Sequence, residues 1–154
     1  MTRKWPEVRK MPVSSLKHPE KYCGKIQYIE FRSSYEISAA KYLDRNDSIL
    51  QWSSEENIVY YKSPIDKRRH RYFVDFYIKY KVASGKTKEA LIEIKPYKDT
   101  LDKPQLTEGM STKTKETVIH AHVINQAKWS AARAYCNKRN MSFFVLTEKD
   151  LLLK

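Results

Sequence analysis

The sequence predicts an α/β fold of the α+β type, in which helices flank a mixed central β-sheet and the elements follow the order αβββαβ. Two observations carry this prediction. One helical segment precedes three strand segments that are close enough to form an antiparallel meander, and a second helical segment separates them from a last strand. A strand that returns to its sheet after a helix can pair in parallel by a right-handed crossover, so the sheet is expected to be mixed.

The distribution of prolines and charges divides the chain into an arm and a body. The 154 residues suffice for one domain with an apolar core. Residues 1–27 are basic, are interrupted by Pro6, Pro12 and Pro19, and follow neither the strand nor the helix period. We therefore expect a basic N-terminal arm over 1–27, ordered by packing on the body or by nucleic acid, and a single domain over 28–154.

The first helix is predicted in the stretch "RSSYEISAAKYLDRND". Ser33 or Ser34 suits the N-cap position, and Asn46 with Asp47 marks the exit. The apolar stripe recurs at helical spacing and is expected to face the core. It consists of Ile37, Ala39, Ala40 and Leu43.

Three strands are predicted after this helix, at 57–61, 71–82 and 89–95. A turn with a tight basic cluster separates the first two, and Gly85 in "ASGKT" suits the turn between the second and third. Within the strand 71–82, alternation would place Val74 and Phe76 on one face.

The C-terminal part is predicted to return to the sheet. Residues 97–117 are expected to form a loop with a short helix, and "VIHAHVI" at 118–124 alternates like an extra strand. Asn125 suits the N-cap of a helix over 126–139, which leads to the last strand, "MSFFVL". Thr147 and Asp150 then form a capping box for a short terminal helix.

The charge balance points to a polyanionic partner. The 30 Lys and Arg residues exceed the 18 Asp and Glu residues, which gives a formal net charge of +12. Such a surplus is typical of proteins that bind DNA, RNA or anionic membranes, although solubility is the simpler explanation. No apolar run has membrane-spanning length, and no signal peptide is visible. Cys23 and Cys136 fit buried thiols in a reducing compartment.

Charged residues inside the predicted strands are the main candidates for chemistry. Asp75 lies among aromatic residues in "FVDFY", and Glu93 and Lys95 alternate with Ile92 and Ile94 in "LIEIK". A hairpin register that places Asp75 beside Glu93 is allowed by the turn. Cross-strand ion pairs on a solvated face would explain Glu93 and Lys95, but a short carboxylate among aromatic rings gains little from such a position.

Two neighbouring carboxylates would favour a bound cation. They repel each other, most strongly where water is excluded, and Mg²⁺ is often held by one or two carboxylates together with waters and substrate phosphate. Lys95 could stabilise charge that develops on a phosphate. Glu36 has two interpretations: it completes a capping box with Ser33, and it shares the inward helix face, which directs it toward Asp75 and Glu93.

A helical Glu, an Asp on a strand and Glu-x-Lys on the next strand resemble the PD-(D/E)XK nuclease superfamily. Asp75 matches the Asp of that motif and Glu93-Ile94-Lys95 match its second half, while Val74 stands in place of the proline. A resemblance to the head-completion nucleases of large contractile-tailed phages covers nearly the whole chain, and transposon-end nuclease subunits share the same core. It is carried by "FRSSYEISAAKYLD", "QWSSE", "KRRHRYFVDFYIKY", "IEIKP" and "AKWSAARAYCNKRNMSFFVLTE".

The resemblance implies a restriction-endonuclease-like core that hydrolyses DNA phosphodiesters, with Mg²⁺ as cofactor and Mn²⁺ as its substitute. Asp75, Glu93 and the backbone carbonyl of Ile94 would hold the metal. Lys95 would orient or activate the attacking water, and Glu36 would hold a second metal or the water network. Glu55 in "WSSE" is an additional candidate. The catalytic set implied by the family is Glu36, Asp75, Glu93 and Lys95.

The resemblance also implies a late step of phage head assembly in the cytoplasm of the infected host cell or in the virion. The partners would be double-stranded DNA with ends or branches, and head, portal or neck proteins of the phage, with no membrane and no small-molecule cofactor. Phosphate contacts carry no sequence information, so little sequence specificity is expected. The DNA-binding candidates are Lys67, Arg68, Arg69, Arg71, Lys128, Arg133, Lys138 and Arg139.

Two other function classes compete with the enzyme. A non-catalytic protein that binds DNA ends in the phage head would keep the nuclease fold, but it has no need of a repulsive carboxylate pair. The second competing class is a basic RNA-associated protein. The sequence lacks the pattern of exposed aromatic residues on which RNA bases stack, which argues against this class. His120 and His122 have no zinc spacing and are expected to be structural or at the surface.

Overall fold

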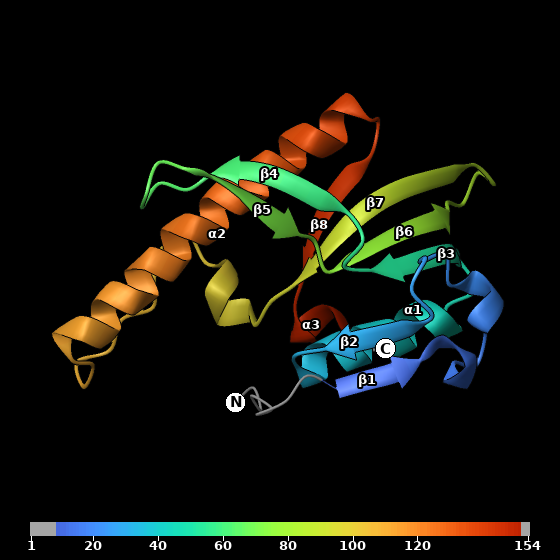
Figure 1. Ribbon diagram of the computed structural model, residues 1–154, viewed down its shortest axis with the longest axis horizontal. Coiled ribbons are helices and arrows are strands. Elements are labelled where there is room, and N and C mark those ends of the chain that lie inside the picture. The colour runs from blue at the N-terminus through green and yellow to red at the C-terminus, as the bar shows by residue number, and fades with distance from the viewer. Residues whose placement is uncertain (1–8, 152–154) are drawn as a thin grey trace.

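A four-stranded central sheet crosses the protein in the computed structural model, which describes residues 9–151 (Figure 1). Its strand order is β3-β6-β7-β8, formed by Ile49–Ser54, Phe76–Lys81, Thr87–Ile94 and Ser142–Leu146. The first three strands pair antiparallel, and β7 pairs with β8 in parallel. One helix precedes this sheet and another connects β7 to β8, so the predicted mixed sheet and the order αβββαβ are confirmed.

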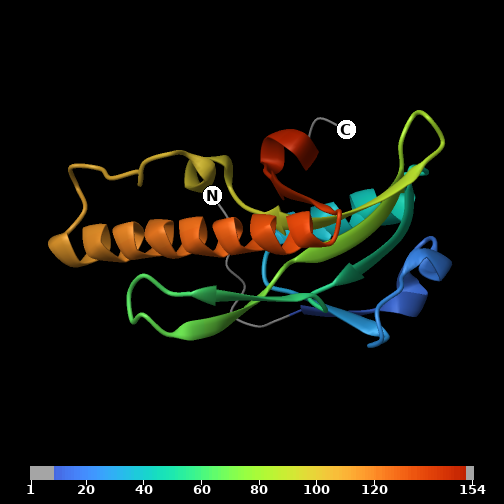
Figure 2. The same cartoon turned by 90° about the horizontal axis from the view of Figure 1, so that it is seen from above.

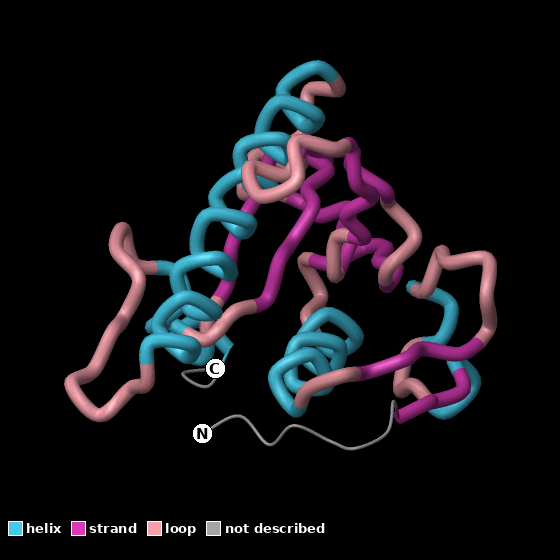
Figure 3. Tube along the Cα trace, turned by 60° about the vertical axis from the view of Figure 1, so that its left-hand side comes forward, coloured by secondary structure: helices cyan, strands magenta, loops and turns pink. Residues whose placement is uncertain are grey.

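The two long helices, α1 (Ser34–Arg45) and α2 (Thr112–Lys138), cover opposite faces of the sheet (Figure 3). One core cluster joins α1 to the sheet through Ile92, and a second joins α2 to it through Leu91. These neighbours on β7 point in opposite directions because strand side chains alternate. The core is therefore divided into two halves by β7, and the candidate site lies where this strand ends.

Local capping sets the ends of α1 as predicted. The Ser33 Oγ accepts a hydrogen bond of 3.2 Å from the backbone N–H of Glu36, and the Asn46 N–H donates to the Tyr42 carbonyl at 3.0 Å. A polar residue at the N-cap position satisfies a backbone donor that the helix itself cannot pair. At the other end of the chain, Thr147 and Asp150 form the predicted capping box of α3 (Glu148–Leu151).

The predicted strand over 71–82 is wrong, because the chain leaves one sheet and enters another at Val74 and Asp75. Residues Ile58–Lys62 (β4) and Arg69–Phe73 (β5) form a separate antiparallel hairpin, and β6 begins only at Phe76. Val74 packs in the core half beside α2, whereas Phe76 packs in the half beside α1, so the two side chains do not share a face. The break frees Asp75 from regular strand geometry.

The unpredicted strand β3 takes the place in the central sheet that we assigned to 57–61. Its Trp52 is fully buried and packs edge-on against Tyr22 at 4.9 Å between ring centroids. The polar residues on either side of this tryptophan hide the strand in the sequence. The turn at Gly85, whose φ is +87°, connects β6 to β7 as predicted.

The second helix is about twice as long as predicted. The strand at 118–124 and the N-cap at Asn125 are both wrong, because α2 begins at Thr112 and its N-cap Ser111 accepts a hydrogen bond from Thr114 N–H at 3.2 Å. The alternation in "VIHAHVI" is a coincidence within a helical stripe that continues into the core. Figure 2 shows the first half of α2 projecting past the sheet, with the segment 101–111 running back along it. In the described residues between β7 and α2, the only helical turn is η3 (Tyr97–Thr100).

Residues 9–27 pack against the body. Strand β1 (Arg9–Pro12) pairs antiparallel with β2 (Tyr28–Phe31), and two short 3₁₀ turns, Val13–Ser15 and Pro19–Lys21, lie between them. The buried Asp44 of α1 accepts hydrogen bonds from the backbone N–H groups of Lys17 and His18 at 2.8 and 3.0 Å. Because this carboxylate satisfies two donors of the irregular segment, it ties that segment to α1.

The two cysteines differ in their surroundings. Both are free thiols, but only Cys136 is buried, and Cys23 is exposed, contrary to the prediction of two buried thiols. No helix within residues 9–151 combines the length and the apolar character that crossing a membrane requires.

Candidate active site

Asp75 and the Glu93–Lys95 segment meet at the end of β7. The register pairs Phe76 with Ile92, which brings Asp75 opposite Glu93 one step beyond the paired residues. The Asp75 Oδ2 accepts a hydrogen bond of 2.8 Å from the backbone N–H of Ile94. The Lys95 N–H donates to the Leu146 carbonyl at 3.0 Å, which holds this end of β7 against β8. The structure thus brings together three of the residues that the sequence singled out.

Glu55 supports the chain break that positions Asp75. Its backbone N–H donates to the Asp75 carbonyl at 3.0 Å, and its carboxylate pairs with the guanidinium of Arg32. Glu55 has a φ of 55°, a left-handed conformation that is uncommon for residues other than glycine. Such strain is often found at functional sites. Here it turns the chain out of β3 directly beside Asp75.

Glu93 is the most enclosed acidic group of the site, with 5% of its surface exposed. The hydroxyl of Tyr72, from β5, donates a hydrogen bond to its carboxylate. The ammonium of Lys128, from α2, lies 5.4 Å from the centroid of the Tyr72 ring. Sequence reasoning missed Tyr72, because nothing in the chain shows that the hairpin folds over β7, and it assigned Lys128 to DNA binding alone.

The carboxylates of the site hold their protons unusually well. Removal from water raises the pKa of Asp75 to about 7, and the negative charges of Glu36 and Glu55 add to this effect. Burial likewise raises the pKa of Glu93 to about 7, against the opposing charges of Lys95 and Lys128. The protein as a whole has a net charge of +12, yet acidic side chains gather at this site. A bound cation would stabilise their ionised form.

Glu36 both caps its helix and acts on the site. Its backbone N–H donates to the Ser33 Oγ, which is one half of the predicted capping box, but its Oε2 accepts a hydrogen bond of 2.9 Å from the N–H of Arg32, one residue before the N-cap Ser33. Burial raises its pKa, the charge of Glu55 raises it further, and the charge of Lys95 lowers it. The side chain therefore lies within electrostatic reach of the Asp75–Glu93 pair.

The donor set suits a hard divalent cation with few protein ligands. Among the residues that the structure describes, no group of three or more His, Cys, Asp or Glu side chains could hold a metal ion by itself. The Asp75–Glu93 pair instead offers two carboxylates, and part of Asp75 remains exposed. Mg²⁺ commonly binds to one or two carboxylates and completes its shell with waters and substrate oxygens, so these residues fit it.

The β4–β5 hairpin presents an outward face of arginines and aromatic rings beside the site. The Arg69 guanidinium lies 3.8 Å above the ring centroid of Tyr60, and that of Arg71 lies 5.7 Å from Phe73. The two rings are 49% and 45% exposed. Lys67 occupies the hairpin turn with a φ of 61°. These exposed rings correct the expectation that the protein lacks exposed aromatics next to its basic residues.

The basic residues predicted on α2 do not form one surface around the site. Lys128 lies within electrostatic reach of Glu93 and Asp75, and burial, reinforced by the charge of Lys95, lowers its pKa. Arg139 instead lies beside Thr87 and Lys88 at the beginning of β7, the strand end opposite Lys95. The structure therefore separates one site lysine from the basic group at the C-terminal end of α2, which contains Lys138 and Arg139.

Comparisons with known proteins agree with this geometry. The family model of the TnsA-like endonuclease N-terminal region matches residues 46–148, which contain Asp75, Glu93 and Lys95. The head completion nuclease of Enterobacteria phage T4 is 34% identical over 137 residues, which cover 88% of this chain and 89% of that protein. No solved structure matches. The predicted resemblance is thus confirmed, and the chain belongs to the TnsA-like endonuclease family.

Proposed function

We propose that this protein is a Mg²⁺-dependent endodeoxyribonuclease of the PD-(D/E)XK type, which hydrolyses DNA phosphodiester bonds with little sequence specificity. The observation that carries the proposal is the Asp75–Glu93 pair beside Lys95. Two carboxylates with pKa values raised to about 7 lower the stability of the metal-free protein at neutral pH, so a purely structural role does not explain them. A cation and a phosphate substrate account for all three side chains.

The residues have separate tasks in hydrolysis, which adds a water across one P–O bond and leaves a phosphate end and a hydroxyl end. Asp75, Glu93 and the backbone carbonyl of Ile94 would hold the metal. When bound, the metal would lower the pKa of water and neutralise charge on the phosphate. The Lys95 ammonium would orient the attacking water and stabilise the charge that develops on the phosphate oxygens. Glu36 would fix the water network or hold a second metal.

The biological setting follows from the similarity to a protein named head completion nuclease. We place this chain in the completion of a phage head after DNA packaging, in the cytoplasm of the infected host cell. Its substrate would be the packaged double-stranded DNA at ends or branches, and its protein partners would belong to the head, portal or neck. The basic hairpin beside the site would contact phosphates without reading bases, which accounts for low sequence specificity.

The purified protein should be incubated with linear, circular and branched DNA in Mg²⁺, in Mn²⁺ and in EDTA. We expect cleavage with either metal and none in EDTA, and loss of cleavage in Glu93→Ala, Asp75→Ala and Lys95→Ala while DNA binding survives. Sequencing of the cut ends should show little base preference.

Two outcomes would contradict the proposal. Cleavage that persists in both Asp75→Ala and Lys95→Ala would show that the metal site is wrongly assigned. Tight DNA binding by the wild-type protein without cleavage in any metal would instead identify a protein that binds DNA ends and is not an enzyme.

A further inference from the structure

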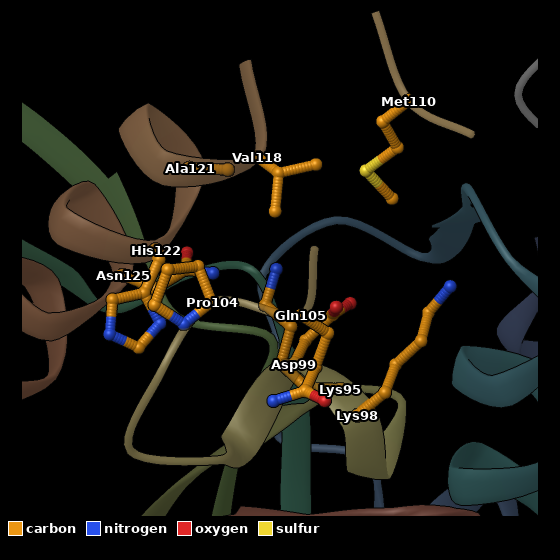
Figure 4. Close-up of a pocket in the computed structure, with 10 residues that line it drawn as sticks. All are labelled: Lys95, Lys98, Asp99, Pro104, Gln105, Met110, Val118, Ala121, His122 and Asn125. Atoms are coloured by element: carbon orange, nitrogen blue, oxygen red, sulfur yellow. The ribbon is translucent and has the colours of Figure 1, made fainter. Parts of the chain in front are cut away.

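A hollow of about 310 Å³ lies between the projecting half of α2 and the segment that precedes it (Figure 4). Lys95 and Lys98 line one part of it, so the hollow opens from the candidate active site. Its other walls come from the segment 99–110 and from one face of α2. We call it the α2 hollow, and its lining includes Asp99, Met110, Val118, Ala121, His122 and Asn125.

The α2 face of the hollow continues the stripe that forms the core. Val118, His122 and Asn125 follow one another at helical spacing, and Trp129 lies one turn further on. Trp129 is buried in the core half beside α2, whereas Val118, His122 and Asn125 are only half-buried, on the part of α2 that projects past the central sheet. The apolar stripe of a helix normally packs against other parts of the protein. Because this part of the stripe faces a hollow instead, a bound molecule could cover it.

Three polar side chains that line the hollow have no partner among the described residues, whereas the Gln105 amide donates to the Lys103 carbonyl at 2.9 Å. Among the described residues, neither the imidazole of His122 nor the side-chain amide of Asn125 has a hydrogen-bond partner, and the carboxylate of Asp99 has none either. The apolar side chains of Met110 and Val118 lie across from the lysines in Figure 4. A suitable occupant therefore has an anionic part for Lys95 and Lys98, a flat apolar part, and donors and acceptors on its edge.

We infer that the α2 hollow receives one unpaired nucleotide of the DNA substrate, next to the phosphodiester that is cut. The phosphate would lie toward Lys95 and Lys98, and the base would lie between the apolar walls with its edge toward Asn125, His122 and Asp99. Pockets that receive an unstacked base pack apolar side chains against its faces and form hydrogen bonds to its edge. The volume is at the lower end for ligand pockets, which suits a single nucleotide.

This occupant defines the substrate class, and the inference rests on the proposed nuclease function. A base in an intact duplex reaches such a hollow only after it has been unpaired and unstacked, which is costly. Nucleotides at single-stranded extensions, flaps and branches are already unpaired. The protein should therefore prefer DNA whose cleavage position adjoins an unpaired nucleotide to a blunt duplex.

Binding in EDTA separates the hollow from the chemistry. A DNA hairpin with a three-nucleotide single-stranded extension, carrying 2-aminopurine at its first unpaired position, is compared with the same hairpin with a blunt end. We expect the extended hairpin to bind at least about tenfold more tightly, because the faces of one base become buried against the apolar walls of the hollow. The 2-aminopurine emission should change on binding, because the base leaves water.

Matched variants locate the effect. Ala121→Phe, which fills the hollow, should reduce the affinity for the extended hairpin to that for the blunt one. Asn125→Ala, which removes one contact to the base edge, should reduce the preference in part. Gln126→Ala and Ile119→Phe, at exposed positions of the same helix that do not line the hollow, should retain the preference. Circular dichroism of Ala121→Phe checks the fold, and Asn125→Ala tests the hollow independently of it.

The failure of either idea has its own signature. Equal affinity of the wild-type protein for both hairpins, or a preference that neither Ala121→Phe nor Asn125→Ala lowers, would overturn the hollow as a nucleotide site while metal-dependent cleavage could still occur. A preference for the extended hairpin without cleavage in Mg²⁺ or Mn²⁺ would support the hollow and overturn the nuclease proposal.

Discussion

The carboxylate of Asp75 accepts a hydrogen bond of 2.8 Å from the backbone N–H of Ile94, the residue between Glu93 and Lys95. This bond fastens the short link between β5 and β6 to the end of β7. Because it uses the backbone of the Glu-x-Lys segment, it leaves the side chains of Glu93 and Lys95 available to a cation and a phosphate. An amide oxygen could accept the same hydrogen bond, so Asp75→Asn can test the charge of Asp75 while the link is retained.

The metal-free protein should lose stability as the pH rises from about 4 to about 7. The folded state holds the protons of Asp75 and Glu93 up to a pKa of about 7, whereas the unfolded chain releases them near 3.8 and 4.5. The folded state binds more protons in this window, so the free energy of unfolding falls with pH. At pH 8 in EDTA, Asp75→Asn should be more stable than the wild type by about 2–4 kcal/mol, and at pH 4 the difference should vanish.

Urea unfolding at both pH values measures this difference. Asp66→Asn is the control, because Asp66 is exposed and the hydrogen bond from Arg68 N–H lowers its pKa, so its substitution should not stabilise the protein at pH 8. Added Mg²⁺ should raise the stability of the wild type more at pH 8 than at pH 5, since the cation binds the ionised carboxylates. A wild-type stability that does not change between pH 4 and pH 8 in EDTA would show that the two carboxylates ionise normally.

Tyr72→Phe should weaken metal binding while the fold is kept. The substitution removes the hydroxyl that donates to Glu93 and leaves the buried ring in place. Groups that orient a metal ligand typically contribute about 10–100-fold in affinity or activity, so calorimetric titration with Mn²⁺ should show a loss of that size. Tyr60→Phe is the matched control, because this tyrosine lies on the same hairpin but faces solvent. Equal affinities in the two variants would mean that Glu93 needs no orienting partner.

Much of the fold could be predicted because it depends on neighbours in sequence. The capping of α1 by Ser33, the turn at Gly85 and the capping box of Thr147 are short-range features, and each is confirmed. The helix that covers residues 118–124 could not be recognised, because its apolar residues in that part meet no core and alternate by chance. Strand β3 was hidden because polar residues separate its two buried apolar side chains, Ile49 and Trp52, from a recognisable strand pattern.

The candidate site was only partly visible because half of it is assembled by tertiary contacts. Asp75 and Glu93 face each other through the hairpin between β6 and β7, so a strand pattern was enough to suggest their proximity. Tyr72 bonds to Glu93, and Lys128 lies within electrostatic reach of it, only because the β4–β5 hairpin leaves the central sheet and folds over β7 together with α2. The break at Val74, on which this depends, interrupts an otherwise continuous strand pattern.

Lys128 should affect the rate of cleavage more than the binding of DNA. Burial lowers the pKa of its ammonium, and the charges of Glu93 and Asp75 oppose this effect, so the group lies within electrostatic reach of the carboxylates. Lys128→Ala should lower the single-turnover rate at saturating DNA by about tenfold or more, as the loss of one positioned charge does, with a smaller change in Kd. Lys138→Ala, at the end of α2, should leave that rate unchanged. A loss confined to Kd would make Lys128 a phosphate contact, as the sequence suggested.

The outward face of the β4–β5 hairpin should carry a measurable part of the salt dependence of DNA binding. Arg69 and Arg71 lie over exposed rings on this face, which limits their motion and directs their charges outward. If each neutralises one phosphate, the double variant Arg69→Ala/Arg71→Ala should reduce the slope of log K against log salt by about 1.8, or about 0.9 for each contact. Fluorescence anisotropy titrations at salt concentrations between about 50 and 200 mM measure this slope.

Arg139→Ala is the control for this slope, because Arg139 lies at the beginning of β7, away from Glu93 and Lys95. A duplex that crosses the active site along the hairpin should not reach it, so its substitution should leave the slope nearly unchanged. If Arg139→Ala lowers the slope and the hairpin variant does not, the DNA must run along the far end of the sheet. The carboxylates would then lie off its path, and the proposed cleavage site would have to be abandoned together with the hairpin surface.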